Sequence, residues 1–148
     1  MKYLCLIYSQ EAQMASMSKS EADALMSEYW AFTEAIKKSG HYVAGEALQP
    51  VHTATTVRMR NGKLSTTDGP FAETKEQLGG FYMIEARDLN DAIQVASRIP
   101  ASRDGSIEVR PVEDFSAAAN ASCMASSARS KSPRRRIRVA STRRESLR

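Results

Sequence analysis

Apolar and polar positions alternate in two different periods along the first three-quarters of the chain, and these periods predict its strands and helices. A short apolar run rich in β-formers at residues 2–8 (KYLCLIY) predicts a buried strand. Ser18 and Glu21 have the spacing of a capping box, which begins a helix, and Gly40 supplies its C-terminal stop. The apolar face of this helix consists of Ala22, Leu25, Met26, Tyr29, Phe32, Thr33 and Ile36.

The segments that follow predict a hairpin, three further strands and a second helix. Residues 41–48 and 81–86 have strand composition, and residues 107–112 alternate apolar and charged positions. Asn61-Gly62, between β-rich runs at residues 53–59 and 64–67, is the strongest short hairpin signal. Asp88 can cap a helix, whose apolar stripe is Leu89, Ala92, Ile93, Ala96 and Ile99.

This order, with the hairpin set aside, is βαββαβ, the split-βαβ pattern of ferredoxin-like α+β proteins. Such a unit places both helices on one face of its sheet and leaves the other face to be covered. For so short a chain, a second copy is the simplest cover. The sequence therefore predicts a homodimer.

Charge divides the 148 residues into two regions. Residues 1–115 carry 12 Lys and Arg against 16 Asp and Glu, whereas residues 116–148 carry 9 against 1, so the net charge of +4 comes from the tail. The tail is rich in Ser, Ala and Arg and has almost no large apolar side chain, which predicts disorder. Its basic residues allow weak, nonspecific contact with nucleic acid; the other explanation is an extension without function.

Several classes of protein are not supported by the sequence. No apolar run approaches the roughly 18–20 residues that span a bilayer, so no membrane association is expected. Cys5 and Cys123 offer neither a disulfide framework nor a zinc spacing, and a cytoplasmic location follows most simply. Cys5, in a buried strand, is expected to be inert packing. No P-loop, Rossmann glycine pattern or other cofactor motif occurs, so no cofactor and no metal are expected.

Residues 68–80 (DGPFAETKEQLGG) resemble the signature of the DGPF group within the YCII-related family. The flanking VAGEALQP at residues 43–50 and IEVRPV at residues 107–112 fit the same pattern, and the similarity covers roughly residues 1–113. The resemblance implies a ferredoxin-like domain that forms a dimeric α/β-barrel. It also implies a link to extracytoplasmic-function sigma factors, whose genes often lie near those of the group, and a His-Asp pair proposed as catalytic in some members.

Asp68 is the first candidate for chemistry. Gly69 and Pro70 would hold its carboxylate in one place after a strand, and fixed position is what a general base needs. Alternatively, the carboxylate only caps its own turn through backbone N–H groups. For a catalytic pair it needs a histidine, and the two in the chain are His41 and His52; His52, in a connecting turn, is taken as the catalytic candidate.

Other polar residues are candidate ligand contacts. Glu73 and Glu76 would share one side of a helical turn and bracket a polar ligand, or else belong to a solvated loop. Glu46 interrupts an apolar strand, where a carboxylate has a catalytic role or forms a structural pair with Arg110. Tyr8 or Tyr82 can present a hydroxyl to an otherwise apolar pocket, with simple core packing as the alternative for Tyr82.

Two functions are consistent with these residues. The first is a small enzyme that binds a small polar ligand in a barrel cleft, with Asp68, His52 and Glu46 in catalysis. The second is a noncatalytic binding or regulatory module linked to sigma-factor signalling. A pocket around Asp68 would favour the first, and an Asp68 side chain in solvent would favour the second.

Overall fold

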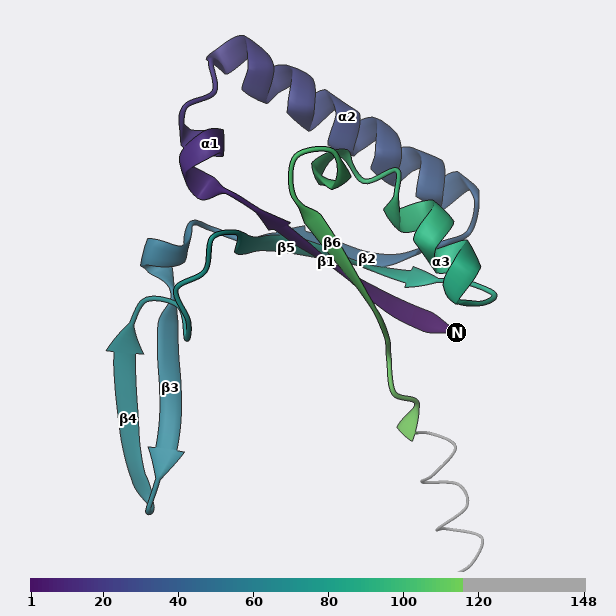
Figure 1. Cartoon of the computed structure of the whole chain (residues 1–148). Coiled ribbons are helices and arrows are strands. Elements are labelled where there is room, and N and C mark those ends of the chain that lie inside the picture. The colour runs from purple at the N-terminus through teal and green to yellow at the C-terminus, as the bar shows by residue number, and fades with distance from the viewer. Residues whose placement is uncertain (116–148) are drawn as a thin grey trace, which may run out of the picture. The chain divides into compact units, whose positions relative to one another are not determined.

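The protein, described here by a computed structural model over residues 1–115, has one four-stranded sheet, helices on one side of it and a separate hairpin (Figure 1). Residues 116–148, where we predict a disordered basic tail, lie outside the described residues. The elements in chain order are β1 (Lys2–Ser9), α1 (Glu11–Ala15), α2 (Lys19–Lys38), β2 (Tyr42–Ala47), η1 (Val51–Thr53), β3 (Thr55–Arg60), β4 (Lys63–Asp68), β5 (Gln77–Glu85), α3 (Leu89–Ala96), η2 (Pro100–Ser102) and β6 (Ser106–Pro111).

The main sheet has the strand order β2-β5-β1-β6, and every neighbouring pair is antiparallel. The two central strands, β1 and β5, come from the first and last thirds of the described domain, so the sheet closes only when these two parts have folded onto each other. The predicted βαββαβ order and the α+β class are confirmed. Pairing between two copies of this sheet, which a dimeric barrel requires, stays a prediction.

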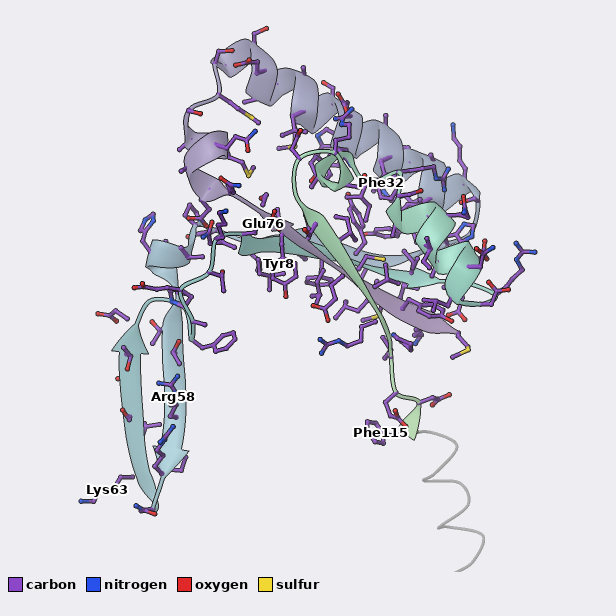
Figure 2. The ribbon with its side chains drawn as sticks, viewed as in Figure 1. Tyr8, Phe32, Arg58, Lys63, Glu76 and Phe115 are labelled. Carbon is purple, nitrogen blue, oxygen red and sulfur yellow. The ribbon has the colours of Figure 1, made fainter. Side chains whose placement is uncertain are left out.

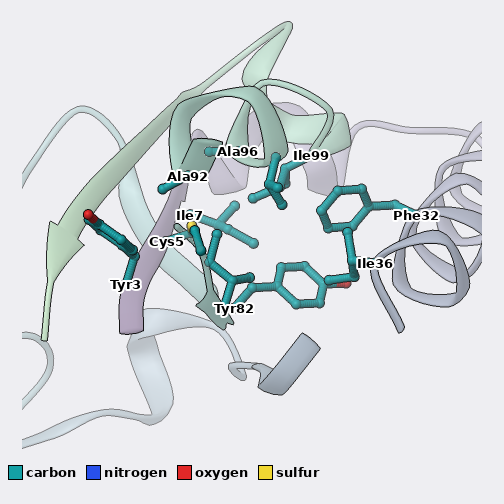
Figure 3. Close-up of a cluster of buried hydrophobic side chains, with 12 residues drawn as sticks. Tyr3, Cys5, Ile7, Phe32, Ile36, Tyr82, Ala92, Ala96 and Ile99 are labelled. Carbon is teal, nitrogen blue, oxygen red and sulfur yellow. The ribbon is translucent and has the colours of Figure 1, made fainter. Parts of the chain in front are cut away.

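The core lies between the sheet and the helices α2 and α3 (Figure 3). Tyr3, Cys5 and Ile7 alternate along β1 and point to this side, where Phe32 and Ile36 of α2 meet them. The Phe32 and Tyr82 rings pack edge to face with their centroids 5.2 Å apart. Cys5 is fully buried, and burial raises the pKa of its thiol to about 11, so it stays protonated at neutral pH as an inert core group.

Local signals set the boundaries of α2 as predicted. Ser18 accepts a hydrogen bond from the Glu21 backbone N–H at 3.3 Å, and the Glu21 carboxylate accepts one from the Ser18 N–H at 2.8 Å. At the other end Gly40 has φ +76°, a left-handed conformation that costs glycine little. The capping box and the glycine stop are therefore both confirmed.

Two elements differ from expectation. β5 begins at Gln77, four residues before the predicted start, because Gly79-Gly80 continues the strand instead of turning it. A short helix, α1, occupies a stretch after β1 for which the sequence predicts no element. Asp68 is the last residue of β4, and Gly69 with φ +99° makes the turn that follows.

The hairpin β3–β4 is separate from the main sheet and extends away from the helices (Figure 1). Asn61 and Gly62 at its tip have φ of 50° and 72°, which matches the tight hairpin turn that their sequence predicts. Within the described residues, no helix is long and apolar enough to cross a membrane.

Candidate functional site

A cleft of about 640 Å³ opens between the sheet and the first half of α2. Its walls come from α1, α2, the facing parts of β2 and β5, and the turn that contains η2. This volume is within the range of roughly 300–1,000 Å³ typical of small-molecule sites. The cleft is therefore the candidate ligand site of the domain.

The cleft exists because only half of the apolar face of α2 is packed. Phe32 and Ile36, in the second half of the helix, are 7% and 0% exposed. Met26 in the first half is 55% exposed, and Trp30, just past the midpoint of the helix, is 63% exposed. Both side chains line the cleft together with Leu25. The predicted stripe is thus correct in its spacing, but its first half faces a hollow and not the core.

The sheet side of the cleft is built largely from backbone, since four of the seven glycines of the chain line it. Gly45 lies directly against the ring of Tyr82. A Cβ there would lie 2.6 Å from Cδ1 of Tyr82, so the tyrosine ring could not keep its place over the strand. Gly45 therefore fixes the position of the Tyr82 ring against Phe32 and Tyr42.

Hydroxyl groups form a directed chain at the back of the cleft. Thr33 Oγ1 donates to the carbonyl oxygen of Tyr29 at 2.8 Å and lies 2.7 Å from the Tyr82 hydroxyl. A threonine hydroxyl has a single hydrogen, so Tyr82 is the donor to Thr33. The Tyr82 oxygen then keeps lone pairs that can accept a hydrogen bond from a molecule in the cleft.

Tyr29, the third member of this group, stays a neutral phenol. Burial raises its pKa and the neighbouring Tyr82 adds to this, while the Ala101 backbone and Arg103 act in the opposite direction. A phenol whose pKa lies above the ordinary 10.0 is protonated at neutral pH, so Tyr29 cannot serve as a base there.

The charged residues at the cleft edge already have partners or lie in solvent. Lys37 binds Glu34 at 3.0 Å, and its ammonium lies 5.4 Å from the centre of the Tyr42 ring. Glu46 is exposed at the edge of the sheet. The cleft thus combines an apolar wall with hydroxyl groups, which suits an uncharged ligand.

The predicted catalytic group does not assemble within one chain. Asp68 is exposed at the end of β4, and neither the cleft nor the second hollow described below is lined by it. Among the described residues no hydrogen bond or ion pair joins a histidine to Asp68, and His52 is exposed in η1. Gly69 and Pro70 follow in a turn whose Gly69 N–H donates to the Ala54 carbonyl at 2.7 Å.

The predicted acidic pair is also separated from the cleft. Glu73 and Glu76 lie in an irregular segment before β5, so they do not share one side of a helical turn. Glu73 is exposed, and the Glu76 carbonyl accepts a hydrogen bond from Thr74 at 2.6 Å. This segment has the structure of a solvated loop, the alternative named above.

Glu46 and Arg110 do not form the predicted pair, because their strands β2 and β6 are the two opposite edges of the sheet. Arg110 instead pairs with Glu108 on its own strand. Tyr8 alternates with Ile7, which points to the helices, so Tyr8 lies on the other face and does not line the cleft. Of the predicted site residues, Glu46 and Tyr82 border the cleft.

A second hollow of about 530 Å³ lies where the end of α2 meets the start of α3. Here Ser39 Oγ is 2.7 Å from Nδ1 of His41, and Nε2 of His41 is 3.6 Å from Oδ2 of Asp91. Asp91 also accepts hydrogen bonds from the Arg87 side chain and backbone, at 3.2 and 3.1 Å. The His41–Asp91 pair is the contact that joins the end of α2 to the start of α3, and we call this group of contacts the clamp.

Sequence reasoning named the Tyr82 hydroxyl as a pocket candidate, but it missed the contact with Thr33 and the contact between His41 and Asp91. Thr33 and Tyr82 are 49 residues apart, and His41 and Asp91 are 50 apart, so neither pair has a local signal. Only the folded arrangement of sheet and helices brings the members of each pair together. No group of three or more potential metal ligands occurs within residues 1–115.

The fold and this site define an α+β domain with a hydroxyl-lined apolar cleft. The YCII-related domain model matches residues 1–116, and the chain belongs to the YCII-related family. An uncharacterised protein of Rhizobium meliloti (strain 1021) is 36% identical over 114 residues, which cover 76% of this chain and 92% of that protein.

Among solved structures, the 5-chloro-2-hydroxyhydroquinone dehydrochlorinase of Burkholderia phenoliruptrix AC1100, in complex with 2,5-dihydroxybenzoquinone, is similar with a TM-score of 0.44 and 14% identity. The match covers 76% of this chain and 94% of that one. The likeness is too distant to carry an inference about the ligand of this chain.

Proposed function

We propose that the protein is a homodimeric small-molecule-binding protein that holds an uncharged, mostly apolar ligand in the cleft between α2 and the sheet. The observation that carries this proposal is the directed hydroxyl chain at the back of a largely apolar hollow. A few fixed polar groups within an apolar wall are the usual composition of a small-molecule site.

The direction of the hydroxyl chain determines which hydrogen-bonding group a ligand needs. Because Tyr82 donates to Thr33, it presents an acceptor to the cleft, so a ligand with an O–H or N–H group binds there best. An anionic ligand would have to give up its hydration without a free cation to meet, since Lys37, the basic residue of the lining, is engaged by Glu34.

The homodimer is supported by the sheet face that the helices leave bare. Leu4 pairs with Met83 and Leu6 with Phe81, so these four side chains share that face, and all four remain partly exposed. An apolar patch at the centre of a sheet is typical of an interface. A second copy would cover it by packing sheet against sheet, as in a dimeric α/β-barrel.

A catalytic role for Asp68 stays a prediction and needs the dimer, since within one chain this carboxylate is exposed outside the cleft. If it acts on the ligand, Asp68→Asn removes turnover and leaves ligand affinity unchanged. The sigma-factor link likewise stays a prediction.

A thermal-shift screen with matched neutral and charged aromatic compounds tests the proposal. We expect neutral compounds that bear an O–H or N–H group to raise the melting temperature, and Tyr82→Phe to remove most of that rise. Tyr3→Phe is the control, because Tyr3 is a buried tyrosine of the same sheet, and its hydroxyl contacts Met1 and not the cleft. Equal loss in both variants, or stabilisation only by charged compounds, would contradict the proposal.

A further inference from the structure

The hairpin β3–β4 has two chemically different faces. Met59 pairs with Leu64 and Val57 with Thr66, so one face carries three large apolar side chains, which are between 61% and 66% exposed. A two-stranded ribbon is marginally stable alone in water, and such a face is usually covered. Phe71, just past the hairpin in the DGPF segment, is 81% exposed.

The other face of the hairpin is basic. Arg58 pairs with Ser65 and Arg60 with Lys63, so the register places three cations on this side. Arg58 and Lys63 are labelled in Figure 2. Residues 55–68 carry a net charge of +2, from three basic residues and Asp68. The rest of residues 1–115 has 9 Lys and Arg against 15 Asp and Glu, a net charge of −6. A second copy of this domain therefore attracts the hairpin electrostatically.

Hydrogen bonds hold the root of the hairpin in place. The Val51 N–H donates to the Glu11 carboxylate at 2.8 Å, and the Glu11 N–H donates to the Gln77 side chain at 3.1 Å. Thr56 Oγ1 donates to the Gly69 carbonyl at 2.9 Å across the base. These bonds give the hairpin a fixed root on α1 and β5, although its strands pack on neither helix nor main sheet.

The hairpin extends on the side of the sheet opposite the helices, which is the side of the bare face (Figure 1). Six residues per strand, at about 3.3 Å each, give it a length of about 20 Å. Packed sheets lie about 10 Å apart, so a copy seated on the bare face would have its own sheet within the reach of the hairpin. The hairpin would then lie alongside that copy.

We propose that β3–β4 is an intersubunit arm, which packs Val57, Met59 and Leu64 onto the second copy of the chain, with Phe71 as an aromatic anchor at its root. The arm rests on the homodimer of the proposed function and extends its interface beyond the sheet face. Thr55 pairs with Asp68 and lies on the apolar face, so the arm turns the Asp68 carboxylate toward the second copy.

The basic face alone would also suit a nucleic acid, because a two-stranded ribbon fits the major groove. The exposed apolar face favours a protein partner instead, since phosphate contacts make no use of Val57, Met59 and Leu64. The experiment with hairpin variants therefore also measures DNA binding.

Two double variants of the full chain test the apolar and the basic face of the β3–β4 hairpin separately. Met59→Gln with Leu64→Gln changes one directly paired position on the apolar face, and Arg58→Gln with Ser65→Gln changes the adjacent pair on the basic face. All four positions are exposed, so the core stays intact, and circular dichroism checks this. We expect sedimentation to give a dimer dissociation constant at least tenfold higher for the first variant, and less than threefold higher for the second.

Three results would contradict the proposal that β3–β4 is an intersubunit arm. Unchanged dissociation constants for the Met59/Leu64 variant would leave a dimer built from the sheet face only. Monomeric wild-type protein at high micromolar concentration would remove the dimer and the arm together, while ligand binding by the cleft would still stand on the Tyr82 result. Tight binding of a 20-base-pair duplex that the Arg58/Ser65 variant loses, with dimerisation unaffected by the Met59/Leu64 change, would assign the hairpin to DNA.

Discussion

The two halves of α2 have the same apolar spacing and different surroundings. The second half presses Phe32 and Ile36 onto β1 and β5, and both side chains are lost from solvent. In the first half Met26 lies along the cleft, as does Trp30 just past the midpoint, and more than half of each side chain is exposed. One helix thus packs the core at one end and lines the candidate ligand site at the other, and substitutions in its two halves should have different effects.

Removing a side chain from the packed half should have the largest effect. Ile36→Ala deletes a fully buried side chain between helix and sheet, and the free energy of unfolding should fall by about 2–5 kcal/mol. Urea unfolding followed by circular dichroism measures this. A loss below about 1 kcal/mol would mean that α2 is not packed where the structure places it.

Filling the sheet side of the cleft should have an intermediate effect. Gly45→Ala places a methyl group 2.6 Å from the Tyr82 ring and should cost about 1–3 kcal/mol, and it should also weaken ligand binding because the Tyr82 hydroxyl moves. Gly79→Ala is the control, since a Cβ there meets only Ser9 Oγ, at 3.7 Å. Equal stability of the two variants would show that the Tyr82 ring is not fixed by Gly45.

The clamp at the packed end of α2 should be visible in the pH dependence of stability. The hydrogen bonds from Arg87, helped by the charge of His41, lower the pKa of the Asp91 carboxyl from 3.8 to about 2. A lowered folded-state pKa contributes stability above about pH 4 that is lost as the pH falls toward 2. The melting temperature of Asp91→Asn should therefore fall less steeply between pH 4 and pH 2 than that of wild type. An unchanged slope would mean that Arg87 and His41 do not hold the Asp91 carboxylate in the folded protein.

The smallest effect is expected in the open half. Met26→Ala should change the free energy of unfolding by less than about 0.5 kcal/mol, because its side chain is mostly exposed. The same urea experiment checks this, with Ile36→Ala as the comparison. A loss as large as that of Ile36→Ala would show that the cleft is closed in solution.

Local signals explain what could be predicted from the sequence. The Ser18–Glu21 capping box, the Asn61-Gly62 turn and the Asp88 helix cap act within four residues, and the structure has all three. Periodicity identified the apolar face of α2, but it cannot distinguish a core from a hollow. A helix face that packs on a core and one that lines a cleft carry the same apolar residues at the same spacing.

Contacts across the sheet explain what could not be predicted. The partner of Tyr82 depends on the register that sets β5 under α2, and the absence of a Glu46–Arg110 pair depends on the order of the strands. The Tyr82 hydroxyl could be named as a pocket candidate from the sequence, but its partner Thr33 looked like an ordinary position on the apolar face of α2.

The titration of Trp30 emission with 4-tert-butylphenol tests the ligand site most directly, because Trp30 is the single tryptophan of the chain and lines the cleft. We predict a saturable change in emission that Tyr82→Phe weakens about tenfold, and a weaker response to 4-tert-butylanisole, which has no O–H to donate. No saturable change with the phenol, or equal affinity of wild type and Tyr82→Phe, would contradict the assignment of this cleft as a hydroxyl-reading ligand site.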